Sequence, residues 1–294
     1  MTSPPLLTEP VPRYGAAIEL HPLVRRVVAN NPGPMTYHGT STWIVGRGQV
    51  AVIDPGPDDD AHHRALLEAL AGERVAHVLL THGHRDHAAG AARFAAAVEA
   101  PTHGFGRPQA GRNAAAGACH LPFLPDERLA DGAVIEGPGW RLEAIHTPGH
   151  ASDHLCFALA GEGVLFTGDH VMGWSTSMIS PPDGDMAAYM ASLRRLLGRD
   201  DKVFLPGHGP GITDPKGHTQ ALLAHRLARE AAVLAAVREG LATPAAIVSR
   251  LYPGLAAPLL QPATRSVLAH LLKLAEERLV VADQRGGETF RAAN

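Results

Sequence analysis

The stretch THGHRDH at residues 81–87 decides the fold. It contains four side chains that bind transition metals, His82, His84, Asp86 and His87. In an extended segment His82 and His84 point to the same side, and a turn after them lets Asp86 and His87 face a second centre. Zinc accepts imidazole nitrogen and carboxylate oxygen, and iron and manganese also fit these donors. The stretch therefore predicts a metal site rather than a polar loop with surface histidines.

Three more candidate ligands follow along the chain, each in a glycine-containing turn after a predicted strand. They are His150 in TPGH, Asp169 in TGDH and His208 in PGHG. In layered α/β folds ligands gather where strands end. We therefore expect these three side chains to join the residues of the 81–87 stretch.

The pattern before residue 214 alternates short β-like runs with helical stretches, which is typical of a layered α/β sandwich. The predicted strands are 42–45, 50–54, 75–80, 134–135, 141–145, 154–159, 164–167 and 202–205. The predicted helices are 61–70 and 88–98.

The last part of the chain has a different, mostly helical pattern. Asp214-Pro215 predicts a helix start, and the apolar periodicity continues to Gly240. Two more helices, from Thr243-Pro244 and near 264–277, precede strands at 279–282 and 289–290. This order predicts a winged-helix-like domain. The predicted domains are 1–213, a connecting helix at 214–240, and 241–294.

The composition excludes several classes of protein. Hydrophobic residues make up 45% of the 294, and no apolar run approaches the roughly 18 residues of a membrane span. With 26 basic and 29 acidic residues the net charge is -3, so no overall charge attracts nucleic acid or anionic lipid. Two cysteines, Cys119 and Cys156, and a start without an export signal predict a cytoplasmic protein with buried thiols.

The motifs of residues 31–210 together resemble the metallo-β-lactamase fold superfamily. The resemblance implies a four-layer αββα sandwich with a two-metal site. It implies two groups of three ligands and one bridging carboxylate, namely His82, His84 and His150; Asp86, His87 and His208; and Asp169. Asp54, in the DPG turn, would orient the metal-binding loop.

The chemistry of such a site is hydrolysis without a protein nucleophile. Two cations about 3.5–4 Å apart can share a water, lower its pKa to near 7 and supply hydroxide. Asp86 is our candidate catalytic residue, because it can orient the bridging hydroxide while it ligates. We expect two zinc ions, with iron or manganese as alternatives. A structural zinc site is disfavoured, since such sites are closed and usually rich in cysteine.

The branches of the superfamily are separated by further motifs. Asp169 and His87 disfavour the exported β-lactamases, His84 disfavours the flavodiiron reductases, and the short spacing from His150 to Asp169 leaves no room for a β-CASP insertion. The motifs NPGP, GTST, TPGHASDH and PGHGP, with the winged-helix-like tail, resemble the lactamase-β-like-2 group. That group contains single-strand endoribonucleases and thioesterases of carrier-bound polyketides. Ser41 and Pro55 depart from its usual residues.

Three hypotheses about function follow. The first is cleavage of phosphodiester bonds in single-stranded RNA, with Arg250, Arg265 and Lys273 on the RNA backbone. The alternative is a thioesterase or other acyl-ester hydrolase acting on a small-molecule substrate. The third is a non-enzymatic winged-helix nucleic-acid binder with a vestigial metal site, which the complete ligand set disfavours. The oligomeric state stays open, a homodimer included, and no membrane partner is expected.

Several other side chains have two interpretations each. His154 is either a substrate-positioning acid or a packed supporting histidine. Met172, Trp174 and Met178 line a pocket or belong to the core. His170 is expected to be structural. Seven further histidines are expected to face solvent or to be capped, namely His62, His63, His103, His120, His218, His225 and His270.

Overall fold

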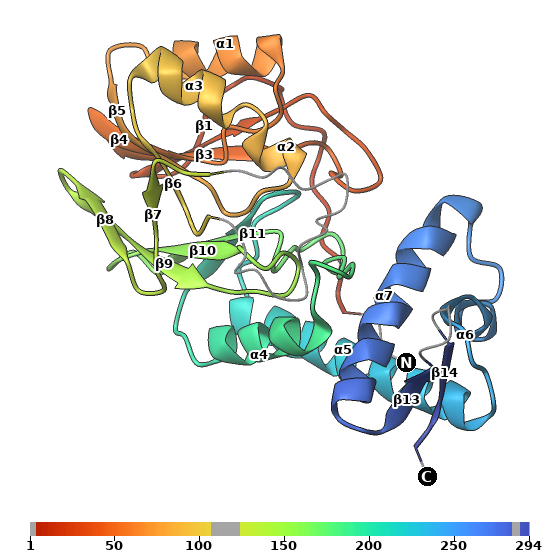
Figure 1. Ribbon diagram of the computed structural model, residues 1–294. Coiled ribbons are helices and arrows are strands. Elements are labelled where there is room, and N and C mark those ends of the chain that lie inside the picture. Colours follow the sequence, from red (N-terminus) through yellow and green to blue (C-terminus); the bar gives the residue numbers. More distant parts are fainter. Residues whose placement is uncertain (1–3, 107–123, 284–288, 294) are drawn as a thin grey trace.

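The computed structural model describes residues 4–106, 124–283 and 289–293. Within these residues, the part before residue 214 forms two sheets and the helices that cover them (Figure 1). The strands of the first sheet are β1 (Ile18–His21), β2 (Val24–Val28), β3 (Ser41–Arg47), β4 (Gln49–Ile53), β5 (Arg74–Leu79), β6 (Thr102–Gly104) and β7 (Glu127–Arg128). Those of the second are β8 (Val134–Gly137), β9 (Trp140–His146), β10 (Leu155–Leu159), β11 (Val164–Gly168) and β12 (Val203–Pro206). The helices are α1 (Asp60–Ala69), α2 (Arg85–Ala88), α3 (Ala91–Val98) and α4 (Met186–Leu197).

The two sheets stack face to face between two helical layers. The first sheet keeps the sequence order β1 to β7, and the second has the order β12-β11-β10-β9-β8. Helices α1 and α3 cover the outer face of the first sheet, and α4 covers that of the second (Figure 1). The core between the sheets contains Trp43 and Phe166, whose ring centroids are 5.6 Å apart. The predicted αββα sandwich is therefore confirmed.

The predicted helix at 88–98 is interrupted. Its residues fall into α2, which begins earlier at Arg85, and α3, with a break at Ala89 and Gly90. Gly90 N donates to Gly56 O, and a Cβ at Gly90 would lie 2.9 Å from Pro57 O. Close contact with the DPG turn thus replaces continuous helix at this point. Five elements were not predicted: β1, β2, β6, β7 and α4.

The C-terminal part has the predicted order of elements. It contains α5 (Pro215–Arg238), α6 (Pro244–Leu251), α7 (Ala257–Glu276), β13 (Val280–Asp283) and β14 (Thr289–Ala292). Asp214 and Thr243 cap α5 and α6 by accepting hydrogen bonds from Gly217 N and Ala246 N. Helix α7 begins before the predicted start and contains Pro262. Residues 284–288, between β13 and β14, lie outside the described part of the chain.

The domain after α5 is a winged-helix-like unit with its own apolar core. The core joins α5, α6, α7 and the β13-β14 hairpin, and includes Leu271 and Phe290. Helix α5 lies against both α4 and α7, so it links the two parts of the chain (Figure 1).

The fold agrees with the expectations for Cys156 and for membrane-spanning segments. Cys156 is buried, and burial raises the pKa of its thiol to about 12, as expected for an inert thiol. Cys119 lies outside the described residues. Within the described ranges, no helix combines the length and the apolar character needed to cross a membrane.

Candidate metal centre

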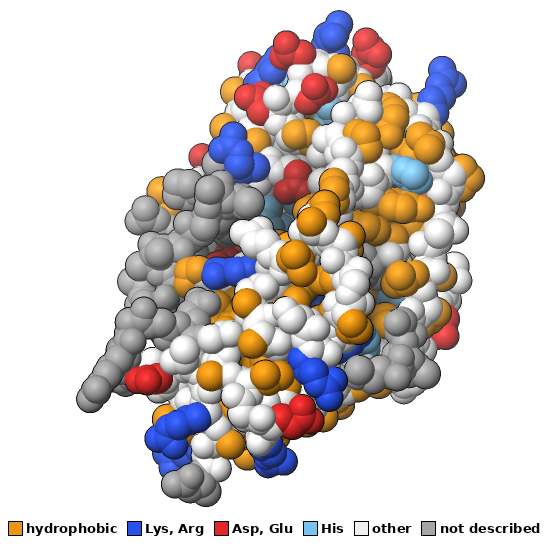
Figure 2. Space-filling view, turned by 90° about the vertical axis from the view of Figure 1, so that its right-hand side faces the viewer, with side chains coloured by type: hydrophobic (Ala, Val, Ile, Leu, Met, Phe, Trp, Pro, Cys, Tyr) orange, Lys and Arg blue, Asp and Glu red, His pale blue; other side chains and the backbone are white. Residues whose placement is uncertain are grey.

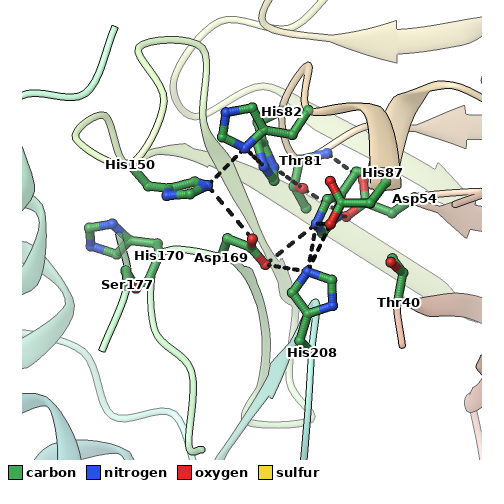
Figure 3. A network of polar contacts seen from close by, with 12 residues as sticks. Thr40, Asp54, Thr81, His82, His87, His150, Asp169, His170, Ser177 and His208 are labelled. Atoms are coloured by element: carbon green, nitrogen blue, oxygen red, sulfur yellow. Dashed lines mark hydrogen bonds and ion pairs between the residues drawn. The ribbon is translucent and has the colours of Figure 1, made fainter. Parts of the chain in front are cut away.

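The seven candidate ligands lie close together. Figure 3 labels five of them, namely His82, His87, His150, Asp169 and His208. Each follows the end of a strand: β5 leads into the 81–87 stretch, β9 into His150, β11 into Asp169 and β12 into His208. Helix α2 presents Asp86 and His87 in its first turn. Chain segments more than 100 residues apart in sequence therefore meet at a single site.

The first group of ligands consists of His82, His84 and His150. His84 Nδ1 lies 2.9 Å from His82 Nε2 and 3.0 Å from His150 Nε2. His82 and His150 are buried and His84 is partly exposed. Three imidazole nitrogens thus converge on one point that remains open on one side.

The second group consists of Asp86, His87 and His208. His208 Nε2 lies 3.1 Å from Asp86 Oδ2 and 3.2 Å from His87 Nε2. Both histidines are completely buried, whereas the Asp86 side chain is 29% exposed.

Asp169 lies between the two groups (Figure 3). Its Oδ2 is 3.6 Å from His150 Nε2, and its Oδ1 is 3.4 Å from the Nε2 atoms of both His87 and His208. Oδ1 is buried, and no hydrogen-bond partner is assigned to it among the described residues. Each oxygen therefore faces one group, which is the arrangement that a bridging carboxylate needs.

The outer nitrogens of His150 and His208 are held by backbone carbonyls. His150 Nδ1 lies 2.7 Å from Met178 O, and His208 Nδ1 lies 3.2 Å from Gly39 O. A carbonyl only accepts, so each Nδ1 carries the hydrogen. When such a ring is neutral, as a metal ligand must be, its lone pair is on Nε2, which points into the site.

Asp54 fixes His82 and His87 in the same way. Its carboxylate accepts from Thr81 N at 2.8 Å and Thr81 Oγ1 at 2.7 Å, and His87 Nδ1 donates to it at 2.8 Å. Because the Thr81 hydroxyl donates to Asp54, its contact of 2.9 Å with His82 Nδ1 is one in which Thr81 accepts. Both rings again direct Nε2 inward, and Asp54 orients the loop as the resemblance implied.

The site attracts positive charge. Burial opposes ionisation of Asp169, but the neighbouring His208 and His87 hold the pKa of this carboxyl well below its usual range. Burial disfavours charge on His208, yet Asp169 and Asp86 raise its pKa to about 9. Burial and the nearby histidines lower the pKa of His82 well below its usual value. The buried carboxylate of Asp169 and the partly exposed one of Asp86, among convergent imidazoles, thus fit divalent cations.

His154 supports the centre without facing it. Its Nε2 accepts from the backbone N–H of Asp169 at 3.2 Å, and its Nδ1 lies 2.9 Å from Thr147 Oγ1. The ring is completely buried. The structure therefore favours the supporting role over the substrate-positioning one. His170 is also fully buried, in agreement with a structural role.

Four of the histidines expected to face solvent or to be capped are buried. They are His62, His103, His218 and His270. His62 Nε2 contacts Thr42 Oγ1 at 2.9 Å, and His218 Nε2 contacts Met172 O at 3.0 Å. Their polar contacts are with distant residues, which the local sequence does not indicate. His120 lies outside the described part of the chain.

Two pockets meet at the candidate ligands. The α5 pocket, of about 280 Å³, lies between the loop after β11 and helices α5 and α7. The α2 pocket, of about 310 Å³, contains His84 and Asp86 and extends to Pro182 and Arg265. The two share four residues, namely Met35, His150, Asp169 and Met178. A substrate centred on the ligands can therefore extend in two directions.

The walls of the α5 pocket include residues that sequence reasoning missed. Met172, Trp174 and Met178 line it, as one of their two interpretations proposed. His225 and Arg226, with Arg229, reach it from α5. The sequence does show these three polar side chains at positions i, i+1 and i+4 of a predicted helix, which could have marked a functional face. Nothing local in the sequence places that face beside Asp169.

Comparisons with known proteins agree with this architecture. The sequence model described as Metallo-beta-lactamase superfamily matches residues 35–208, and the one described as Beta-lactamase associated winged helix domain matches 243–288. A protein of Aspergillus fumigatus named Atrochrysone carboxyl ACP thioesterase is 32% identical, covering 94% of this chain and 88% of its own. The Lactamase-like protein adaB of Aspergillus niger is 31% identical, with 92% and 86% covered.

Solved structures show the same two-part fold. A metallo-beta-lactamase family protein from Thermus thermophilus has a TM-score of 0.75 at 27% identity, covering 93% of this chain and 100% of that one. A Beta-lactamase domain protein from Burkholderia ambifaria has a TM-score of 0.82 at 22% identity, covering 97% and 96%. The likeness extends through the helical C-terminal part as well as the sandwich.

Proposed function

The chain belongs to the metallo-β-lactamase superfamily and is a hydrolase of that superfamily, and we propose that it hydrolyses acyl thioesters at a centre of two zinc ions. In this proposal residues 1–213 form the catalytic domain, 214–240 the connecting helix and 241–294 the winged-helix-like domain. Iron and manganese are the alternative metals, since the same donors accept them.

The metal part of the proposal rests on the geometry of the donors. One ion would be held by His82, His84 and His150, the other by Asp86, His87 and His208, with Asp169 shared. The support is the inward direction of the Nε2 atoms and the position of the buried Asp169 carboxylate between the two groups. When bound, two such cations lower the pKa of a water to near 7 and polarise the electrophile.

Asp86 is the proposed catalytic residue. It lines the α2 pocket, and its side chain is 29% exposed, against 9% for Asp169. Its carboxylate therefore has one side toward His208 and another toward the space in which a substrate would lie. In that position it can accept a hydrogen bond from the attacking water and hold its proton as the scissile bond breaks.

The thioester part rests chiefly on the two pockets that meet at His150 and Asp169. A thioester has two arms, acyl and thiol, that extend from one reacting carbonyl. The wall between the pockets carries Met35 and Met178, and the α5 pocket adds Met172 and Trp174. The flexible methionine side chains and the apolar ring of Trp174 suit an acyl or pantetheine-like chain. The thioesterase names of relatives support the same choice.

The RNA hypothesis has less support. Two of the three cations proposed for the RNA backbone are engaged by carboxylates: Arg250 lies 3.6 Å from Glu239, and Lys273 lies 2.7 Å from Glu230. On the face shown in Figure 2, Lys and Arg are scattered among hydrophobic and acidic side chains rather than gathered into a stripe. Sequence-independent RNA binding needs such a stripe. The third hypothesis, a nucleic-acid binder with a vestigial site, is disfavoured by the convergence of all seven donors.

The experiment is a thiol-release assay on protein loaded with zinc, iron or manganese. Its substrates are acyl thioesters of N-acetylcysteamine and of phosphopantetheine, and a labelled single-stranded RNA is tested in parallel. We expect metal-dependent thioester hydrolysis that falls about 10²- to 10⁴-fold in Asp86→Asn. The matched control, Asp58→Asn, changes an exposed carboxylate and retains activity. Metal-dependent cleavage of RNA, with no thioester hydrolysed, would overturn the proposal.

A further inference from the structure

The α5 pocket has an unbalanced set of charges. Arg226 and Arg229 line it, and the acidic residue in its described walls is Asp169, which faces the candidate metal ligands. Asp169 is committed to the imidazoles on either side of it. The two arginines thus share the pocket with no carboxylate of their own among the described residues.

Arg226 is the stronger anomaly. It is only 4% exposed, and among the described residues it makes no salt bridge. Its guanidinium donates to two neutral oxygens, Ser177 O and Ser266 Oγ, and lies 5.4 Å from the ring centroid of Tyr189. Its Nε has no assigned partner in the described part of the chain. A buried cation without an anion is costly, because burial removes its hydration.

A second donor in the same walls is also unsatisfied. Trp174 Nε1 is buried, and no acceptor is assigned to it among the described residues. Its ring is held in place by stacking on Tyr37, with centroids 5.0 Å apart. Indole N–H and guanidinium N–H groups only donate. Both unsatisfied atoms belong to side chains that line the pocket and both need an acceptor, and the charge of the arginines favours an anionic one.

Arg229 and His225 complete the wall. Arg229 lies over Tyr252, 4.6 Å from the ring centroid, and is partly exposed, so a ligand can reach its guanidinium. Burial, Arg226 and Arg229 lower the pKa of His225 to about 4. At neutral pH His225 is therefore an uncharged ring, and the positive charge of this wall comes from the two arginines.

We propose that the α5 pocket binds an anionic oxygen group of the substrate, a carboxylate or a phosphate, through Arg226, Arg229 and Trp174. The inference rests on the proposed thioesterase function, since it describes one arm of that substrate. Two sources of the anion share this chemistry. One is a carboxylate at the far end of the acyl chain, and the other is the phosphate of a phosphopantetheine thiol arm.

A purely structural role for Arg226 would leave different traces. Its bond to Ser177 O ties α5 to the loop after β11, and a neutral donor would serve that tie equally well. The unpartnered Nε and Trp174 Nε1, and the second arginine in the same wall, are not needed for it. An Arg226→Gln variant that keeps the thermal stability of the parent but loses anion recognition therefore separates the two roles.

The experiment uses two pairs of thioesters on the metal-loaded full chain. The first pair is glutaryl-N-acetylcysteamine and its neutral carboxamide isostere. The second is one neutral acyl group on pantetheine and on phosphopantetheine. We expect kcat/KM to be about 10- to 100-fold higher for the anionic member of one pair, mainly through KM. The pair that shows the preference identifies the source of the anion.

The variants are Arg229→Gln and Arg226→Gln, with Arg238→Gln as the matched control on the exposed face of α5. Arg229→Gln is expected to reduce the preference to less than about threefold, mainly by raising KM for the anionic member, and Arg238→Gln should retain the preference. Equal rates within both pairs, or a preference that survives both pocket variants, would overturn the inference. Such an outcome leaves thioester hydrolysis intact.

A binding measurement covers the case in which no thioester is hydrolysed and the proposed function itself fails. Calorimetry with glutarate and with inorganic phosphate should then show binding that is weakened about tenfold or more in Arg229→Gln. Equal affinity of Arg229→Gln and Arg238→Gln for these anions would refute the anion site, whether or not the protein hydrolyses thioesters.

Discussion

His87 Nδ1 lies 2.8 Å from Asp54 Oδ2, and the two side chains are almost completely buried. Asp54 accepts at the same time from the backbone N–H and the hydroxyl of Thr81. One carboxylate therefore sets both the rotation of His87 and, through Thr81, that of His82. The two rings belong to different ligand groups, so Asp54 couples the geometry of both.

Asp54→Asn is predicted to weaken metal binding at both positions. An amide oxygen can replace one of the accepted hydrogen bonds, but its NH₂ group opposes the Thr81 or His87 donor. Loss of such an outer partner typically costs 10- to 100-fold in metal affinity. Competition for the metal between the protein and a chelating dye measures the affinity for each of the two ions. Asp58→Asn, in the same loop but exposed, should bind both ions as the parent does.

Gly207→Ala is predicted to disturb the centre without affecting the fold. A Cβ at this position would lie 2.6 Å from His87 Cε1 and 2.7 Å from Asp169 Oδ1. These atoms belong to the second ligand group and the proposed bridge, so we expect at most one tightly bound ion and at least a tenfold loss of activity. Metal content by elemental analysis and a thermal melt test this. In Gly211→Ala the nearest contact is 3.4 Å, and that variant should retain both ions.

His154→Gln tests the supporting role of this buried ring. His154 Nε2 accepts the N–H of Asp169, and a glutamine oxygen can take over this bond only with changed geometry. We expect weaker metal retention and a lower kcat with an unchanged KM, because His154 contacts a candidate ligand rather than substrate. An acidic limb of the pH–rate profile that disappears in the variant would instead show direct proton transfer by His154.

His62 is predicted to make the fold sensitive to acid. Burial lowers its pKa to about 4 from the usual 6.5. Between these values the unfolded chain binds a proton that the folded chain does not, so stability is lost as the pH falls from about 6.5 toward 4. Each such proton changes the free energy of unfolding by up to about 1.4 kcal/mol per pH unit.

His62→Gln removes this titration. The free energy of unfolding, measured with urea at several pH values between 7 and 4, should therefore fall less steeply with falling pH in this variant than in the parent. The neighbouring His63 is less deeply buried, and burial lowers its pKa to a smaller extent. His63→Gln is therefore the control. If the free energy of unfolding of His62→Gln depended on pH as steeply as that of the parent, the prediction would be contradicted.

Local patterns in the sequence predicted much of this fold. Predicted strands at 42–45 and 50–54 match β3 and β4, and Asp214 and Thr243 begin α5 and α6 by capping them. These features depend on residues within a few positions of one another. The spacing of the motifs did not indicate to which ligand group His150, Asp169 and His208 belong. The resemblance to a family supplied that assignment.

Features that depend on distant contacts were not predicted. The break at Gly90 results from the approach of the DPG turn, more than 30 residues earlier. His218 is buried because Met172 O accepts from it, 46 residues away. Arg226 and Arg229 enter the pocket only because α5 lies beside the loop after β11. A helical periodicity identifies a face of α5 but not the segment that it meets.

The metal ligands and much of the wall of the α5 pocket come from different parts of the chain. All candidate metal ligands precede residue 214, whereas much of the pocket wall comes from α5 and α7. Substitutions in those helices can change which molecule is admitted while the metal-binding residues stay the same. Substrate choice could thus diverge among relatives with an unchanged reaction, and exchanging the C-terminal helices between two of them should transfer preference without transferring chemistry.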